Sequence, residues 1–135
     1  MRELATSEIL LEETPYVNLT AKGRKTGLDR RVELWFVFED GKLLCLAHED
    51  SDWWKNIAKN ARVEVEVSEI IFQGRGKLVP EKLEHAFALF RRKYGESQIA
   101  RWYGEDRGHR RAVEIELERV LGKRPTSREP LVVAI

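Results

Sequence analysis

Hydrophobic and polar residues alternate along much of the chain, and this pattern predicts β-strands. Residues 62–68 show it most clearly, because three valines alternate with two glutamates. In such strands the valines face the core and the glutamates face water. Outward-facing side chains are therefore expected at Glu64, Glu66, Glu114, Glu116 and Glu118. Six segments are predicted as strands, namely 16–21, 31–38, 42–48, 62–68, 70–79 and 112–120.

Glycines mark the places where these strands turn or bend. Asp40-Gly41 separates the second and third predicted strands and has the signature of a tight hairpin turn. Gly74 and Gly76 interrupt the fifth strand and predict a bulge or sharp bend. Bends of this kind allow a sheet to close on itself.

Helical spacing of apolar residues appears in three segments. The first, 52–59, follows Ser51, which is a suitable N-cap residue. The second begins at Pro80 and ends before Gly95, and a short third helix covers 97–103. Strands joined by tight turns and interrupted by helices predict a mainly β (α+β) fold, a small antiparallel barrel with short flanking helices.

The length of 135 residues predicts a single domain, 1–135. After the sixth strand, residues 122–130 have the composition of a tail. Residues 131–135 are apolar, and we expect them to add an edge strand or to pack on a partner subunit. The role of the whole segment 122–135 stays open.

Charge and cysteine content narrow the class of protein. The 24 Lys and Arg against 23 Asp and Glu give a net charge of +1, which provides no general attraction to nucleic acid or anionic membranes. Any anion site must therefore be local. The single cysteine, Cys45, excludes an intramolecular disulfide and favours the cytoplasm. No stretch approaches the roughly 20 apolar residues of a membrane span, and the N-terminus lacks a signal-peptide pattern.

A dense group of cations lies between the first two predicted strands: Lys22, Arg24, Lys25, Arg30 and Arg31. Glycines at 23 and 27 allow backbone amides to converge on an anion. Arg24 can donate two hydrogen bonds to a phosphate or carboxylate, Lys25 adds a point charge, and Thr26 adds a hydroxyl. The hairpin is thus a candidate phosphate clamp. The alternative is a solvated turn whose charges only keep an exposed loop soluble.

Other candidate residues carry weaker signals. Trp53 and Trp54 can form a wall for an aromatic ligand, although at least one is expected to anchor its helix to the barrel. The three histidines, His48, His85 and His109, have no metal-ligand spacing, so no metal site is predicted. A second basic and aromatic region, 101–111, is either a solvated helix end or the cover of a ligand.

An ordered set of short motifs covers residues 16–79. It comprises Leu19–Gly27 with Gly-Arg-Lys-Thr-Gly at its end, Leu34-Trp35, Asp40-Gly41, Asp52–Ile57 and Lys59–Val65. In order and spacing this set resembles the deazaflavin-dependent nitroreductase family. The resemblance implies the six-stranded antiparallel split β-barrel of the flavin and deazaflavin oxidoreductases related to pyridoxamine phosphate oxidase.

The resemblance also implies an activity. The chain would transfer hydride from a reduced deazaflavin coenzyme to an electron-poor small molecule such as a quinone, a nitro compound or an activated alkene. Because the coenzyme carries the chemistry, no catalytic acid or base is required of the protein. Carried over by position, the coenzyme-binding residues would be Lys22, Arg24, Lys25 and Thr26 at the acidic tail, Ala47, His48, Glu49 and Trp53 at the ring, and Arg62 as an added charge.

Some positions depart from the family pattern. His48-Glu49-Asp50-Ser51 stands where the family has a small residue and a Gly-Gly pair, which narrows the ring site or changes its polarity. Ala61 and Glu33 replace two prolines. Tyr94 and Tyr103 fall where the family often places tyrosines on the substrate side.

Alternatives remain open at this point. FMN could replace the deazaflavin, since the same barrel hosts it, and the protein could carry or sense a flavin without turnover. A small barrel that binds nucleic acid through the basic hairpin and its tryptophans is a further class, against which the near-neutral charge argues. The resemblance favours a homodimer.

Overall fold

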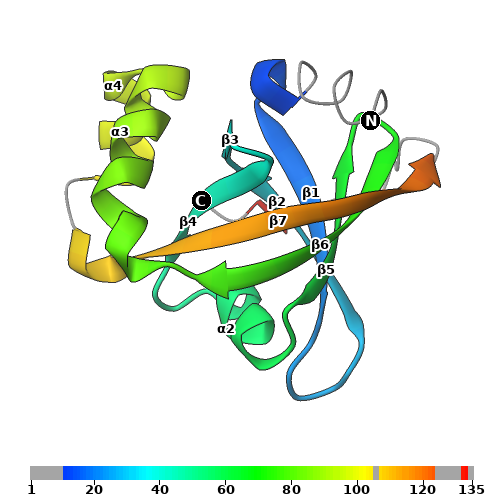
Figure 1. The fold of residues 1–135 in the computed structure, drawn as a ribbon. Helices are drawn as coiled ribbons and strands as arrows, with labels where there is room; N and C mark the ends of the chain where they lie inside the picture. The colour runs from blue at the N-terminus through cyan, green and yellow to red at the C-terminus, as the bar shows by residue number, and fades with distance from the viewer. Residues whose placement is uncertain (1–10, 105–106, 124–131, 134–135) are drawn as a thin grey trace.

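The alternating segments form one strongly curled sheet in the computed structural model, which describes residues 11–104, 107–123 and 132–133 (Figure 1). Its strands are β1 (Tyr16–Lys22), β2 (Asp29–Trp35), β3 (Val37–Glu39), β4 (Lys42–His48), β5 (Arg62–Val67), β6 (Ile70–Leu78), β7 (Arg110–Lys123) and β8 (Val132–Val133). The helices are α2 (Asp52–Lys59), α3 (Leu83–Tyr94) and α4 (Glu96–Trp102), with 3₁₀ turns η1 (Pro80–Lys82) and η2 (Arg107–His109). The predicted strands and helices are all present, with ends that differ by a few residues.

The order of the strands explains the curl. They follow one another as β3-β4-β7-β6-β5-β1-β2-β8, and every pairing is antiparallel except that of β2 with the two-residue β8. Only Phe36 separates β2 from β3, so one continuous segment lies near both edges of the sheet. The predicted count of six strands is therefore wrong, because one predicted strand is divided at Phe36 and β8 is added.

The division at Phe36 has a visible cause. The Phe36 N–H donates to the hydroxyl of Tyr94 at 2.9 Å, and the Phe36 carbonyl accepts from Tyr94 at 2.7 Å and from Lys93 Nζ at 2.9 Å. The backbone groups of Phe36 thus bond to α3 instead of to a neighbouring strand. Tertiary contacts of this kind override the local sequence pattern, which alternates without interruption over residues 31–38.

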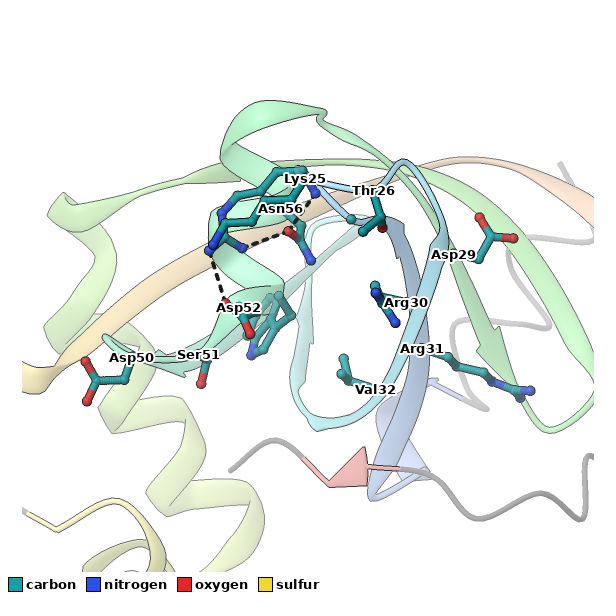
Figure 2. A pocket seen from close by; sticks show the side chains of 13 residues that line it. Lys25, Thr26, Asp29, Arg30, Arg31, Val32, Asp50, Ser51, Asp52 and Asn56 are labelled. Atoms are coloured by element: carbon teal, nitrogen blue, oxygen red, sulfur yellow. Dashed lines mark hydrogen bonds and ion pairs between the residues drawn. The ribbon is translucent and has the colours of Figure 1, made fainter.

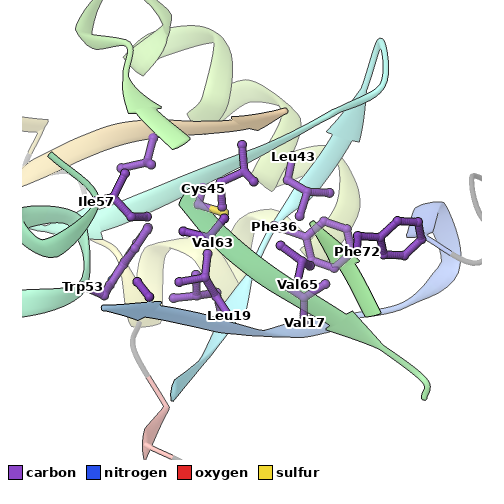
Figure 3. Packing of buried hydrophobic residues seen from close by; sticks show 14 of the residues in the cluster. Val17, Leu19, Phe36, Leu43, Cys45, Trp53, Ile57, Val63, Val65 and Phe72 are labelled. Atoms are coloured by element: carbon purple, nitrogen blue, oxygen red, sulfur yellow. The ribbon is translucent and has the colours of Figure 1, made fainter. Parts of the chain in front are cut away.

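The inner faces of the sheet and one face of α2 enclose the main hydrophobic core (Figure 3). Val65 and Phe72 are completely buried there, and the tight hairpin turn at Asp40-Gly41 forms as predicted, with positive φ at both residues. A second core cluster lies between the sheet and the helices α3 and α4, which stand side by side in Figure 1. Helices α3 and α4 therefore cover one side of the barrel, and α2 packs on another side.

Two glycines allow β6 to bend and α2 to come close. The β6–β7 ladder shifts register between Ile71 and Phe72 and again between Gln73 and Gly74, as the predicted bulge requires. A Cβ on Gly76 would lie 2.7 Å from Ile57 of α2, which is too short for any real contact. Gly76 therefore sets how closely α2 packs on the sheet.

Two local predictions are wrong. Glu66 and Glu114 are buried, at 8% and 3% exposure, although they were expected to face water. Glu66 pairs with Arg31, and η1 folds back over β7 so that Lys82 contacts Glu114. The side chain of Ser51 makes no capping hydrogen bond to α2, although the residue occupies the N-cap position.

The C-terminal prediction is only partly covered by the described residues. Val132 and Val133 pair with β2 as an edge strand. The rest of the predicted tail, 124–131, and residues 134–135 lie outside the described part of the chain. None of the helices in the described ranges has the length and apolar composition needed to cross a membrane.

Candidate functional site

A cleft of about 760 Å³ opens between the β1–β2 loop and α2, and the two walls face each other in Figure 2. Its size is typical of a small-molecule or cofactor site. The loop supplies one wall and the start of α2 the other. The lining residues are Gly23, Arg24, Lys25, Thr26, Asp29, Arg30, Arg31, Val32, Asp50, Ser51, Asp52, Trp53 and Asn56.

The loop backbone is fixed by its own hydrogen bonds. Gly23 N–H donates to the Leu28 carbonyl and Gly27 N–H to the Gly23 carbonyl, each at 2.8 Å, while Leu28 N–H donates to Thr26 Oγ1 at 3.2 Å. Gly27 has a φ of +72°, which favours glycine. A Cβ on Gly23 would lie 3.0 Å from Thr26 Oγ1, so only glycine keeps this surface of the cleft open.

Arg24 ties the loop to α2. Its backbone N–H and its Nη1 both donate to Asn56 Oδ1 at 3.0 Å, and its Nη2 donates to Asp52 Oδ1 at 3.1 Å (Figure 2). Asn56 is buried, at 3% exposure. Arg24, predicted to grip the coenzyme tail, therefore also serves to hold the two walls of the cleft together.

Pairing leaves an excess of positive charge at the cleft. Asp52 is paired with Arg24, and Asp29 with Lys22 at 2.5 Å. Lys25 and Arg30 make no hydrogen bond or ion pair with any described residue. Two cations, one from the loop and one from β2, thus remain available to an anion.

The indole of Trp53 is a second unsatisfied group. Trp53 is only 4% exposed and lines the cleft, and no described residue provides a hydrogen-bond partner for its buried Nε1–H. An indole nitrogen can only donate, so the missing partner is an acceptor. The neighbouring Trp54 differs, because its Nε1 donates to the His48 carbonyl at 2.9 Å.

Three of the four residues predicted at the ring, Ala47, His48 and Glu49, lie at the end of β4, beside this cleft but not in its lining. Ala47 is buried in the main core. His48 Nδ1 accepts a hydrogen bond from the backbone N–H of Asp50 at 3.1 Å. Glu49 pairs with His109 at 2.5 Å and with Arg111 at 3.4 Å, and the hydrogen bond from His109 holds the Glu49 pKa below its usual value.

Lys22 and Arg62 lie elsewhere. Both line a separate hollow of about 560 Å³ on the other side of the β1–β2 hairpin. Lys22 is paired with Asp29, and Arg62 donates to Gln73 Oε1 at 3.1 Å. The structure does not bring these two predicted residues into the cleft that Lys25 and Thr26 line.

The two predicted substrate-side tyrosines belong to the helix-side core. Tyr94 stacks on Trp35 with ring centroids 4.5 Å apart, and its single hydroxyl proton is shared between the Pro15 carbonyl at 2.6 Å and the Phe36 carbonyl at 2.7 Å. Tyr103 is 3% exposed and lies under the Arg110 guanidinium at 4.5 Å. Burial raises the pKa of both phenols, and neither lines the cleft.

Sequence reasoning left some lining residues without a role. Arg30 was counted among the loop cations, but no motif singled it out, and Asn56 appeared only as a member of the Asp52–Ile57 motif. The signal was present in the alternation of β2, which places Arg30 and Val32 on the same face of the strand. Across the described ranges, no cluster of three His, Cys, Asp or Glu side chains is arranged to hold a metal ion.

Solved structures share this fold. An F420-H2 dependent reductase (FDR-A) is 26% identical, with a TM-score of 0.58 over 77% of this chain and 94% of that one. An FAD-binding protein from Mesorhizobium loti is 18% identical, with a TM-score of 0.67 over 87% and 89%. The haem storage protein HutZ from Vibrio cholerae is 15% identical, with a TM-score of 0.73 over 91% and 96%. Identities this low for the latter two show the fold alone.

The family follows from the sequence itself. No curated protein matches the chain. The family model of the F420H(2)-dependent quinone reductases matches residues 2–105, which is most of the chain and includes both walls of the cleft. The prediction of a deazaflavin enzyme is thereby confirmed. The chain belongs to the F420H(2)-dependent quinone reductase family and is a deazaflavin-dependent oxidoreductase.

Proposed function

We propose that the cleft between the β1–β2 loop and α2 holds the acidic tail of the deazaflavin coenzyme. The loop offers the hydroxyl of Thr26 and the charge of Lys25. Arg30 adds a second unpaired cation from β2. Charge-assisted hydrogen bonds from such groups suit phosphate and carboxylate oxygens.

The observation that carries this proposal is the buried, unpartnered Nε1–H of Trp53 in the same cleft. Leaving such a donor unsatisfied costs about 1–3 kcal/mol, so proteins retain one where a ligand supplies the acceptor. We assign Trp53 a place where the tail joins the ring, with its N–H directed to a coenzyme oxygen. Ala47, His48 and Glu49, at the end of β4, would lie on the ring side, as the family pattern implies.

When bound, the reduced coenzyme supplies a hydride. A quinone that receives this hydride and one proton from solvent becomes a quinol, so two electrons and two hydrogens are accounted for. The chain's own residues bind and orient: Arg24 holds the cleft walls together, and Trp53 forms a dry surface. No residue needs to exchange a proton for this step. Nitro compounds and activated alkenes are acceptors of the same electron-poor class.

The roles of Lys22 and Arg62 are secondary in this proposal. They flank the neighbouring hollow and would act on the tail only at longer range, where solvent and salt screen their charge. Tyr94 and Tyr103 would act on the acceptor only indirectly, by holding α3 and α4 against the sheet.

We further propose that residues 1–135 act as one domain in the cytoplasm, where the buried free thiol of Cys45 stays reduced. Because only Phe36 interrupts it, β2–β3 would act as one strand of the split barrel. A homodimer is proposed from the family pattern, and sedimentation equilibrium would test it.

The experiment is a side-by-side titration of the protein with the deazaflavin coenzyme and with FMN. We expect saturable deazaflavin binding and much weaker FMN binding. Replacing Lys25 with Ala should weaken deazaflavin binding by about 1.5–3 kcal/mol, which is about tenfold to about 150-fold in Kd.

Lys59→Ala is the matched control, because Lys59 is an exposed lysine at the end of α2 that does not line the cleft. It should leave Kd unchanged. Equal affinities of the wild-type protein and Lys25→Ala would contradict the assignment of the tail to this cleft.

A further inference from the structure

A second cavity lies at the foot of α3, away from the cleft described above. It has a volume of about 450 Å³ and lies where η1, η2 and the start of β7 come together (Figure 1). The wall is largely apolar and contains two arginines. The lining residues are Leu78, Pro80, Leu83, Gly108, Arg110, Arg111 and Ala112.

Arg110 is the unusual member of this wall. It is 7% exposed, and its Nη2 donates to the Trp102 carbonyl at 3.2 Å. Its guanidinium lies over the ring of Tyr103 at 4.5 Å. Its Nη1 is buried and has no hydrogen-bond partner among the residues that the structure describes. No carboxylate of the described residues forms an ion pair with Arg110.

A buried guanidinium without an anion is costly, because burial removes its hydration and nothing replaces the lost charge interaction. The carbonyl of Trp102 and the face of Tyr103 compensate only in part. Arg111, the other arginine of the wall, contrasts with it, because Arg111 pairs with Glu49 at 3.4 Å. Of the two arginines in this cavity, Arg110 is therefore the one without a counter-ion among the described residues.

The remaining wall restricts which anion would fit. Leu78, Leu83 and Ala112 offer no hydrogen bonds, so a phosphate dianion would leave most of its oxygens unsatisfied. A carboxylate has one negative charge and two oxygens, which one guanidinium can satisfy. The apolar side chains would cover a short hydrocarbon body.

We propose that this cavity is a binding site for a small amphipathic monocarboxylate, whose carboxylate pairs with Arg110 and whose apolar body lies against Leu78, Leu83 and Ala112. This site is separate from the coenzyme cleft and does not depend on the function proposed for it.

Octanoate is the probe, measured by calorimetric titration of the full chain. Two matched ligands test the two parts of octanoate separately. Octanol keeps the apolar body without the charge, and acetate keeps the charge without the apolar body. We expect saturable octanoate binding, with both matched ligands weaker by about tenfold or more. Absence of saturable octanoate binding, or equal binding of octanol, would overturn the proposal.

Variants locate the site. Arg110→Met should weaken octanoate by about tenfold or more, whereas Arg101→Met should change nothing. Arg101 is the matched control, because it is an exposed arginine that stacks on Trp102 at 5.1 Å and does not line the cavity. Lys25→Ala should also bind octanoate normally, which excludes binding in the coenzyme cleft. Unchanged affinity in Arg110→Met would refute the site.

A second variant covers the case in which Arg110→Met does not fold. Leu78 is 37% exposed, so Leu78→Glu is tolerable in the fold and places a carboxylate at the cavity. We expect it to abolish octanoate binding by competing for Arg110. Normal octanoate binding by a folded Leu78→Glu protein would contradict the proposal.

Discussion

The cleft proposed to hold the coenzyme differs from the aromatic cluster beside α3 in how well its polar groups are satisfied. This cluster consists of Trp35, Phe90, Tyr94 and Tyr103. In the cleft, Lys25 and Arg30 have no partner within the described part of the chain, and the N–H of Trp53 is buried there without one. In the aromatic cluster, the Tyr94 hydroxyl accepts a hydrogen bond from the Phe36 N–H at 2.9 Å and shares its one proton between the carbonyls of Pro15 and Phe36 at 2.6 and 2.7 Å. Polar groups of the cleft therefore remain available to a ligand, whereas the Tyr94 hydroxyl does not.

This difference separates binding residues from structural ones. A tyrosine near a helix end and a lysine in a loop are equally plausible ligands in a sequence. Once folded, Tyr94 completes the hydrogen bonding of Phe36, where the strand divides, while Lys25 remains open to solvent. Substitutions in the aromatic cluster should therefore change stability, and substitutions in the cleft should change affinity.

The largest expected effect is on stability, from Phe90→Ala. Phe90 is fully buried and contacts Tyr94 and Tyr103 with centroid distances of 5.5 Å. Removing its ring should lower the free energy of unfolding by about 3–5 kcal/mol. Chemical denaturation measures this loss, and coenzyme affinity of the folded protein should stay the same. If coenzyme affinity fell together with stability, the division between stabilising and binding residues would be wrong.

Burial of Lys93 makes the free energy of unfolding depend on pH. Burial lowers its pKa from 10.5 to about 8 in the folded protein. Between pH 8 and 10.5 the unfolded chain therefore binds more protons than the folded one, so this residue makes stability rise with pH across that window. The difference in unfolding free energy between the wild-type protein and Lys93→Met should rise with pH there. A flat difference would contradict the burial of the charge.

Tyr94→Phe tests the hydrogen bonds alone, since it keeps the aromatic ring. The Phe36 N–H would lose its acceptor, and the expected loss of unfolding free energy is about 1–3 kcal/mol. Thermal and chemical denaturation would measure it. If activity fell while stability held, Tyr94 would act on the acceptor after all, and the division between the two regions would fail.

Trp53→Phe should have the smallest effect. It removes an unsatisfied donor, so the folded protein without coenzyme should lose little stability. The coenzyme, however, should bind less tightly by about 0.5–1.5 kcal/mol, the net value of one hydrogen bond. Trp54→Phe is the matched control for affinity, because the Trp54 N–H already donates to the His48 carbonyl. Equal affinity of Trp53→Phe and wild type would refute the role of the indole.

The sequence predicted the parts of the fold that local patterns determine. The valines of β5, the Asp40-Gly41 turn and the start of the second helix at Pro80 each carry a local rule that the structure obeys. The break at Phe36 and the burial of Glu114 could not be predicted, because both depend on α3 and η1 folding back onto strands distant in sequence.

For the candidate site, too, the sequence predicted only what local patterns determine. The basic loop between the first two strands was identified from its glycines and cations, and it does line a cleft. The tie from Arg24 to Asn56, residues 32 positions apart, and the placement of Lys22 and Arg62 in another hollow required the three-dimensional arrangement.

The most direct test of the central claim is the indole N–H spectrum of the protein labelled with ¹⁵N at its four tryptophans, recorded during titration with the deazaflavin coenzyme. The account predicts that the Trp53 resonance moves most and exchanges more slowly with solvent, because its N–H gains an acceptor. The signals of Trp35 and Trp102, which do not line the cleft, should move little. A saturated coenzyme complex in which the Trp53 signal stays in place would contradict the claim.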